Sequence, residues 1–267
     1  GLIDTDEIKI HKTDPNGIDT DEDDLNDGDE ISIHHTNPTE ADTDQDGLGD
    51  GDEVRIIGTS PLAQDSDGDG IIDGDEDSDS DSLSDAVELY THHTDPKVVD
   101  SDKDGLSDGD EVIHGTQPLK ADSNGNGISD GNEDTDSDGL SDADEFNIHH
   151  TNPKVVDTDQ DGLSDGDEIA LHNTNPAKAD TDNDGLTDAG EVHAIGTNPS
   201  LQDTDGDGII DGDEDSDSDG LSDAVELNLY HTNPKMADTD QDGLSDSDEI
   251  KYGTNPLEVD SNGNGIS

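Results

Sequence analysis

The sequence contains no cysteine and no tryptophan, and its aromatic residues are one Phe and three Tyr. The lack of cysteine excludes disulfides, thiolate zinc sites and iron–sulfur clusters. Only 24% of the 267 residues are hydrophobic, which is too little to build a conventional globular core. No apolar run approaches membrane-spanning length, so we expect no membrane insertion.

Positive charge is also scarce, because 10 Lys and Arg stand against 76 Asp and Glu, for a formal net charge of −66. Binding nucleic acid needs a basic surface, so nucleic acid is not an expected partner. Such an excess of acid is typical of disordered polyanions. The acids nevertheless recur at fixed offsets around Gly and Leu, which disorder does not require. We therefore expect an ordered chain that needs a counter-charge.

A twelve-residue acidic phrase, D-x-D-x-D-G-[LI]-x-D-x-x-E, recurs along the whole chain and is clearest at residues 157–168. A hard cation such as Ca²⁺ binds roughly six to eight oxygens. Side chains at loop positions 1, 3, 5, 9 and 12, with the backbone carbonyl of position 7, offer such a set. We predict at least one Ca²⁺ in nearly every complete loop, with position 9 binding directly or through water.

The chain is interpreted as one continuous tandem array, residues 1–267, cut from a longer protein. Residues 1–7 match loop positions 6 to 12 and residues 260–267 match positions 1 to 8, so both are partial loops. The complete loops are 19–30, 42–53, 65–76, 77–88, 100–111, 122–133, 134–145, 157–168, 180–191, 203–214, 215–226 and 238–249.

The predicted metal ligands follow from these loop positions. They are Asp4, Glu7, Asp19, Asp21, Asp23, Leu25, Asp27, Glu30, Asp42, Asp44, Asp46, Leu48, Asp50, Glu53, Asp65, Asp67, Asp69, Ile71, Asp73, Glu76, Asp77, Asp79, Asp81, Leu83, Asp85, Glu88, Asp100, Asp102, Asp104, Leu106, Asp108, Glu111, Asp122, Asn124, Asn126, Ile128, Asp130, Glu133, Asp134, Asp136, Asp138, Leu140, Asp142, Glu145, Asp157, Asp159, Asp161, Leu163, Asp165, Glu168, Asp180, Asp182, Asp184, Leu186, Asp188, Glu191, Asp203, Asp205, Asp207, Ile209, Asp211, Glu214, Asp215, Asp217, Asp219, Leu221, Asp223, Glu226, Asp238, Asp240, Asp242, Leu244, Asp246, Glu249, Asp260, Asn262, Asn264 and Ile266. The Leu and Ile residues in this set are included for their backbone carbonyls.

Two spacings separate successive loops. Most loops start 22 or 23 residues apart, whereas at three places the next loop starts after only 12. The back-to-back loops meet at Glu76–Asp77, Glu133–Asp134 and Glu214–Asp215. Two ions are expected close together at each of these junctions. A higher-order period of 138 residues, from Asp65 to Asp203, favours a fibre or stalk over a globule.

A spacer of about eleven residues follows each of the other loops, as in residues 169–179. Its pattern predicts a short helix of one to two turns that starts near loop position 10. The helix is expected to end at a left-handed residue such as Gly58 or Gly196. Thr-Asn-Pro then forms a turn, because Pro disfavours helix just before itself. Only three residues remain before the next loop, too few for the entering helix of an EF-hand.

Few apolar residues are available to pack in each repeat. Around the loop at 157–168 they are Leu163, Ile169, Leu171, Val155 and Val156. Burying so few side chains cannot offset the conformational entropy that a whole repeat loses on folding. We therefore expect bound metal to supply much of the order.

Several residues admit two interpretations. The pairs His34–His35, His92–His93 and His149–His150 stand where Gly stands in other spacers, which favours helix capping, with zinc binding as the alternative. Aspartates at loop position 11, such as Asp110 and Asp167, either face solvent or bind a further ion.

Three loops depart from the consensus. Asp24 and Ser82 replace the Gly of position 6, and we expect the loop with Ser82 to be among the weakest because Ser tolerates a left-handed backbone poorly. Asn124 and Asn126 replace carboxylates, which keeps oxygen ligands but lowers the charge and the expected affinity.

The loop of residues 157–168, the missing entering helix and phrases such as Gly253-Thr254-Asn255-Pro256-Leu257 resemble thrombospondin type 3 repeats of the bacterial sort. This resemblance implies a mostly irregular, elongated, calcium-bound repeat array in a secreted or surface protein. Animal members of the family carry disulfides, so this chain must depend on ions and small aliphatic clusters instead.

These observations predict an extracellular or cell-surface structural protein, a stalk, spacer or fibre stiffened by a row of Ca²⁺ ions, about one or more per loop. An adhesive module that binds itself or a surface partner, and a calcium reservoir, are the alternatives. An enzyme is not expected, because without a core nothing holds catalytic groups in place or excludes water.

Overall fold

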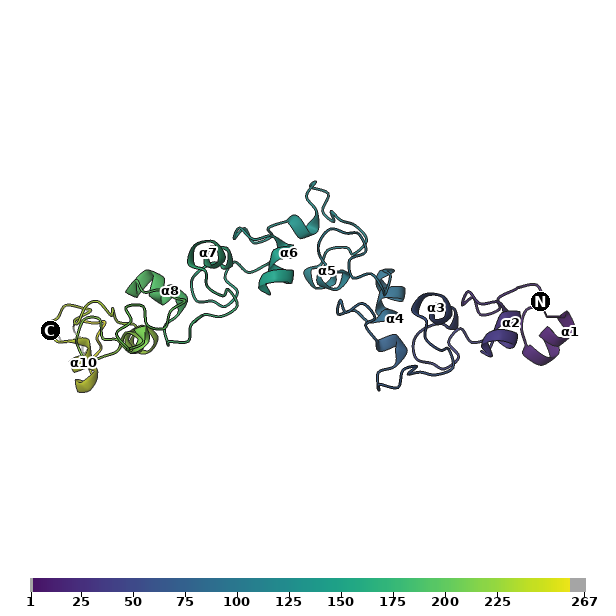
Figure 1. The fold of residues 1–267 in the computed structure, drawn as a ribbon, viewed down its shortest axis with the longest axis horizontal. Coiled ribbons are helices and arrows are strands. Elements are labelled where there is room, and N and C mark those ends of the chain that lie inside the picture. The colour runs from purple at the N-terminus through teal and green to yellow at the C-terminus, as the bar shows by residue number, and fades with distance from the viewer. Residues whose placement is uncertain (1, 260–267) are drawn as a thin grey trace. The chain divides into compact units, whose positions relative to one another are not determined.

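The computed structural model describes residues 2–259. The partial loop at 260–267, with the predicted ligands Asp260, Asn262, Asn264 and Ile266, lies outside the described residues. The chain divides into two compact units, Gly1–Asn132 and Glu133–Ser267. Figure 1 shows short coiled segments alternating with irregular loops in both units. Within residues 2–259 there is no strand.

Both units contain the same kinds of short helical segment. In the first unit they are Asp4–Asp6 (α1), Glu7–His11 (η1), Asp27–Asp29 (α2), Glu30–His34 (η2), Asp50–Asp52 (α3), Glu53–Ile57 (η3), Asp73–Asp75 (η4), Asp85–Val87 (α4), Glu88–His92 (η5), Asp108–His114 (α5) and Asp130–Asn132 (η6). In the second unit they are Asp142–Asp144 (α6), Glu145–His149 (η7), Asp165–Asp167 (α7), Glu168–His172 (η8), Asp188–Gly190 (α8), Glu191–Ile195 (η9), Asp211–Asp213 (η10), Asp223–Val225 (α9), Glu226–Tyr230 (η11) and Asp246–Tyr252 (α10).

A short helix follows each loop that has a spacer, as predicted. After loop 157–168, α7 continues into the π-helical turn η8, in which Asn173 N donates to Glu168 O at 2.6 Å. The helix begins at loop position 9, one residue before the predicted start, because Ser164 caps it by accepting a hydrogen bond from Asp167 N. It ends at left-handed Asn173, and Gly58 and Gly196 end their helices in the same way.

The loops at 65–76, 122–133 and 203–214 each run directly into another loop, and we call them the leading loops. Their helix is reduced to one 3₁₀ turn: η4, η6 and η10. Glu76 and Glu214 then adopt extended backbone, with ψ of 156° and 158°. Without a spacer, no residues are available to form the final helical turn.

The buried interior is largely polar. Five leucines at loop position 7 are buried, among them Leu48 at 0% and Leu163 at 5% exposed, and so are most position-9 aspartates and position-12 glutamates. Leu171, however, is 68% exposed and Val156 44%, so the expectation that these aliphatics pack is wrong. A helix this short turns only one side toward the neighbouring loop, and that side carries the Glu.

No helix in the described part of the chain combines the length and the apolar character that crossing a membrane would need.

Candidate metal centres

The first half of each loop is a tight turn that gathers carboxylates. Asp157 accepts hydrogen bonds from Gln160 N at 2.7 Å and Gly162 N at 3.0 Å, and Asp161 accepts one from Leu163 N at 2.8 Å. Gln160 and Gly162 both have positive φ, of 63° and 109°. This turn brings the predicted ligands of positions 1, 3 and 5 together, with carboxylate oxygens within 4.8 Å of one another in three groups: Asp19, Asp21 and Asp23; Asp42, Asp44 and Asp46; and Asp65, Asp67 and Asp69.

The turn also forms where position 6 is not Gly. Asp24 and Ser82 adopt φ of 76° and 83°, and each donates its backbone N–H at 3.0 Å to the aspartate of position 1, Asp19 or Asp77. A left-handed backbone costs a non-Gly residue free energy. Weaker binding at the loop with Ser82 therefore stays a prediction.

Position 12 of the nine complete loops with a spacer is a buried Glu with one unsatisfied oxygen, and in eight of them a threonine holds the other oxygen. In loop 157–168, Thr174 Oγ1 donates to Glu168 Oε1 at 3.0 Å. The same bond, at 3.0–3.2 Å, joins Thr36 to Glu30, Thr59 to Glu53, Thr94 to Glu88, Thr116 to Glu111, Thr151 to Glu145, Thr197 to Glu191 and Thr232 to Glu226. The buried Oε2 atom finds no hydrogen-bond partner in Glu30, Glu53, Glu88, Glu111, Glu145, Glu168, Glu191, Glu226 or Glu249.

The aspartate of position 9 accepts hydrogen bonds inside its own loop, and its role as a calcium ligand, direct or through water, stays a prediction. Asp165 accepts hydrogen bonds from Thr158 N at 2.8 Å and Thr158 Oγ1 at 2.6 Å, so both its oxygens are engaged inside its own loop. The same residue position also approaches the preceding loop. Asp50 lies in one group with Asp23 and Glu30.

We call the group formed by positions 5 and 12 of one loop and position 9 of the next an interloop cluster. Asp46, Glu53 and Asp73 form a second one, in which all three residues are buried. Such a cluster is incomplete without the neighbouring loop. Order in one loop is therefore coupled to order in the next.

A hydrogen bond from a backbone N–H to a carboxylate also joins successive loops. Asp138 Oδ2 accepts a hydrogen bond from Gly166 N at 2.8 Å, 28 residues further on, and Asp161 accepts one from Ala189 N at 2.7 Å. The approach is close, because a Cβ built on Gly166 would lie 2.1 Å from Asp138 O. Position 10 of each such loop therefore covers position 5 of the loop before it.

Crowding of these carboxylates opposes their ionisation. Burial, aided by the neighbouring aspartates, raises the pKa of Glu53 and Glu168 to about 8. The same causes raise the pKa of Glu30, Glu88, Glu111, Glu145, Glu191 and Glu226 to about 8. Burial raises the pKa of Asp21 and Asp159 at position 3 to about 6. A cation held among these groups would remove the cost of their charge.

The histidine pairs take the capping position predicted for them. His35, His93 and His150 are the left-handed residues that end their helices. In His93 the Nδ1 atom lies 3.0 Å from Leu89 O, and in His150 it lies 3.1 Å from Phe146 O. These contacts tie each ring to the last turn of its own helix.

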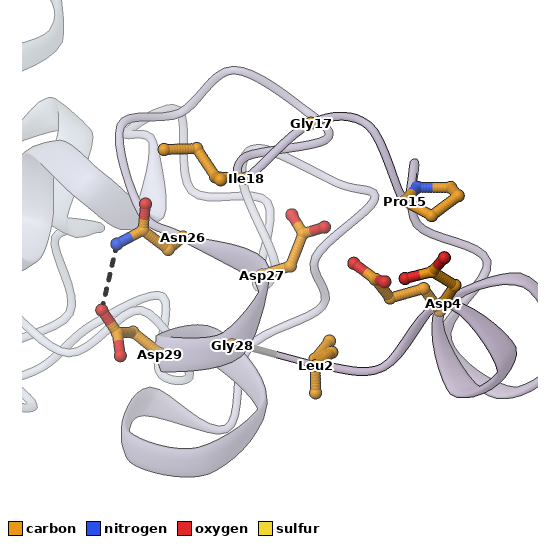
Figure 2. A pocket seen from close by; sticks show the side chains of 10 residues that line it. Leu2, Asp4, Pro15, Gly17, Ile18, Asn26, Asp27, Gly28 and Asp29 are labelled. Carbon is orange, nitrogen blue, oxygen red and sulfur yellow. Dashed lines mark hydrogen bonds between the residues drawn. The ribbon is translucent and has the colours of Figure 1, made fainter.

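A cavity near the start of the first unit is lined by residues at the positions that form an interloop cluster. It is lined by Asp4, Glu7 and Asp27 among others, and Figure 2 shows Asp4 and Asp27 on opposite walls. Glu7 stands at position 12 and Asp27 at position 9 of the next loop. These are two of the three positions that make an interloop cluster.

The donor set fits Ca²⁺. The atoms that converge are carboxylate oxygens, and buried ones lack hydrogen-bond partners at positions 3 and 12. Hard cations with several oxygen ligands suit such a set. The residues that spacing alone did not reveal are the Thr of Thr-Asn-Pro, the Ser or Thr at position 2, and the small residue at position 10.

The chain is similar to a known family of repeats. The bacterial TSP3 repeat matches residues 19–41, 42–63, 100–121, 134–155, 157–179, 180–201, 215–237 and 238–258, and none of these segments includes a leading loop. The comparison with curated proteins finds no match. Among solved structures, the B domain of a biofilm associated protein is 39% identical over 17% of this chain and 11% of that chain, with a TM-score of 0.17. The BSP domain of a biofilm associated protein is 41% identical over 16% of this chain and 8% of that chain, with a TM-score of 0.16. This chain therefore spans only a small part of the length of the structures that it matches.

Proposed function

Because the chain belongs to the bacterial TSP3 repeat family, a family of structural calcium-binding repeats, we propose that it is an extracellular structural protein whose loops are ordered by bound Ca²⁺. Its role is that of a stalk, spacer or fibre segment. Extracellular calcium modules bind with a Kd of about 10⁻⁴–10⁻³ M, so they fill outside the cell and not in the cytosol.

The observation that carries this proposal is the buried, half-satisfied Glu at position 12. In nine loops Glu Oε2 is buried without a hydrogen-bond partner, and in eight of them Thr holds Oε1. Leaving a buried carboxylate unpaired is costly. Such an arrangement, repeated along the chain, is expected of residues whose free carboxylate oxygen binds a cation.

Different loop positions would contribute different ligands to Ca²⁺. Positions 1, 3, 5 and 12 would provide the side-chain oxygens, and position 7 the carbonyl oxygen. Position 9, whose oxygens are held by the Ser or Thr of position 2, would bring negative charge to the ion of the preceding loop. Bound Ca²⁺ would supply the positive charge that lets these carboxylates stay ionised while buried.

A second candidate function is adhesion, and exposed aliphatics favour it. Ile33, Ile148, Leu171 and Leu229, all at loop position 15, are 62–68% exposed. Aliphatics that recur at one position of the repeat could bind a partner or a second copy of this chain. In that case the array would be a calcium-dependent surface module.

Small-angle scattering of the full chain with Ca²⁺ and with excess EDTA tests the structural role. We expect an elongated, well-ordered particle with Ca²⁺ and an expanded, flexible chain in EDTA. A flexible calcium-loaded chain would indicate a reservoir, and a compact globule would contradict the stalk. Loss of self-association or partner binding in Leu171→Ser and Leu229→Ser, with the shape unchanged, would favour adhesion.

A further inference from the structure

The three leading loops share a sequence signature that the other nine complete loops lack. Each has Gly at position 4: Gly68, Gly125 and Gly206. Position 4 is left-handed in all twelve complete loops, and in the other nine it is Glu, Gln, Ser, Lys or Asn. Gly adopts this left-handed backbone without a Cβ penalty, so the signature marks the leading loops but does not itself weaken them.

The leading loops are also uncovered. Their position-7 side chains, Ile71, Ile128 and Ile209, are 48–49% exposed, whereas Leu48 and Leu186 of the loops just before two of them are 0% and 1% exposed. Asp69 and Asp207 at position 5 are exposed as well, whereas Asp46 and Asp184 are buried. A metal held in a leading loop would therefore lack the low-dielectric cover that strengthens binding elsewhere.

In the leading loops 65–76 and 203–214, the position-12 Glu lacks the threonine that follows it in the other loops. With no spacer, no Thr-Asn-Pro follows Glu76 or Glu214, so the threonine that holds Oε1 in the other loops is missing. Both glutamates lie on extended backbone and are half-buried, whereas Glu53 and Glu191 are fully buried at a helix start. The strongest ligand of the loop is thus held least firmly.

The chain on either side of a leading loop is joined without it. Tyr90, in the helix after loop 77–88, donates to Asp52 at 2.7 Å and accepts from Gly49 N at 2.8 Å. Lys97 Nζ donates to Ile57 O at 2.9 Å. Both contacts reach back over loop 65–76 to the loop and spacer at 42–64.

The second unit repeats this bridge. Asn228 Nδ2 donates to Gly185 O at 2.8 Å, across loop 203–214. The 3₁₀ turn of the leading loop stays attached below the bridge, because Asp211 and Gly212 are buried and Gly212 N donates to Asp184 at 3.1 Å. Asn198 N and Asp211 still hold Thr204, whereas residues 205–210 of the outer part are hydrogen-bonded inside the loop, as in Gly208 N to Asp203 at 3.0 Å.

We propose that the leading loops are the low-affinity calcium sites of the array, and that they release Ca²⁺ first. As free calcium falls, residues 65–72, 122–129 and 203–210 open locally while the loops before and after them stay ordered. This inference rests on the proposed function. It makes the array a two-stage calcium sensor and not a rod that melts in one step.

Hydrogen exchange with mass spectrometry on the full chain, at a series of buffered free Ca²⁺ concentrations, tests the proposal. Segments 65–72 and 203–210 should lose protection at about tenfold higher free calcium than their matched segments 42–49 and 180–187. Simultaneous release of all loops, or release of the leading loops last, would overturn the inference while leaving the proposed function intact. Exchange that does not depend on calcium anywhere would instead refute the proposed function.

Discussion

Replacing Glu168 by Gln tests the role of position 12 at a single site. Gln keeps the shape of the side chain and can still accept a hydrogen bond from Thr174, but it removes the charge at Oε2. If free Ca²⁺ is about ten times Kd, loss of one site lowers the free energy of unfolding by about 1.4 kcal/mol.

The structure also predicts where the damage spreads. Asp188 lies close enough to raise the pKa of Glu168, and Ala189 N donates to Asp161, so the next loop depends on this one. Hydrogen exchange should rise across residues 157–191 and stay unchanged near Asp42 and Asp238. The rise in hydrogen exchange should therefore extend into the next loop, at residues 180–191, and not into the loop before.

Asp167→Asn is the matched control for Glu168→Gln. It removes one charge from the same helix, but the side chain of Asp167 is exposed. We expect no measurable change in calcium affinity or in exchange from this variant. Loss of protection along the whole chain in Glu168→Gln, or an unchanged calcium affinity, would refute the assignment of Glu168 as a ligand.

Three further predictions follow from the same contacts. Excess EDTA should abolish the order of the array, and unchanged circular dichroism and hydrodynamic radius in EDTA would show that the metal matters little. Without calcium the array should be more ordered at pH 4 than at pH 9. In the folded loops the pKa of glutamates such as Glu53 is about 8, against an ordinary value of 4.5, so protonation favours the folded state. This contribution to stability is lost as the pH rises through about 8. Calcium affinity should show the reverse dependence and fall with acid, since protons compete for the ligands, and a circular dichroism titration at both calcium levels measures the two trends. Gly166→Ala should destabilise the contact with loop 134–145 by about 1–3 kcal/mol, because its Cβ would lie 2.1 Å from Asp138 O, and thermal melting with Gly196→Ala as a strained but uncrowded control measures this.

Within a loop, spacing alone predicted much of what the structure shows. Asp42, Asp44 and Asp46 converge because a twelve-residue acidic phrase with a turn at Gly leaves them few other arrangements. The short helix and its left-handed end at Gly58 follow equally from local rules. These features depend only on residues close in sequence.

Contacts between loops could not be predicted in the same way. The bond from Gly166 N to Asp138 joins residues 28 apart, and the phrase is the same in both loops, so its pattern does not say which loop covers which. Spacing predicts that position 9 binds the ion of its own loop, and it gives no sign that Asp50 also lies with Asp23 and Glu30 of the preceding loop. The exposure of Leu171 has the same origin, since only the packed neighbour decides which side of a short helix is covered.

Counting the calcium ions bound to the intact chain tests the central claim most directly. Native mass spectrometry at millimolar Ca²⁺, checked by elemental analysis, should find at least one ion for nearly every complete loop. The additional ions of the interloop clusters would raise the number further. A count below about eight ions per chain would contradict the account, because most of the buried glutamates would then have no cation to hold.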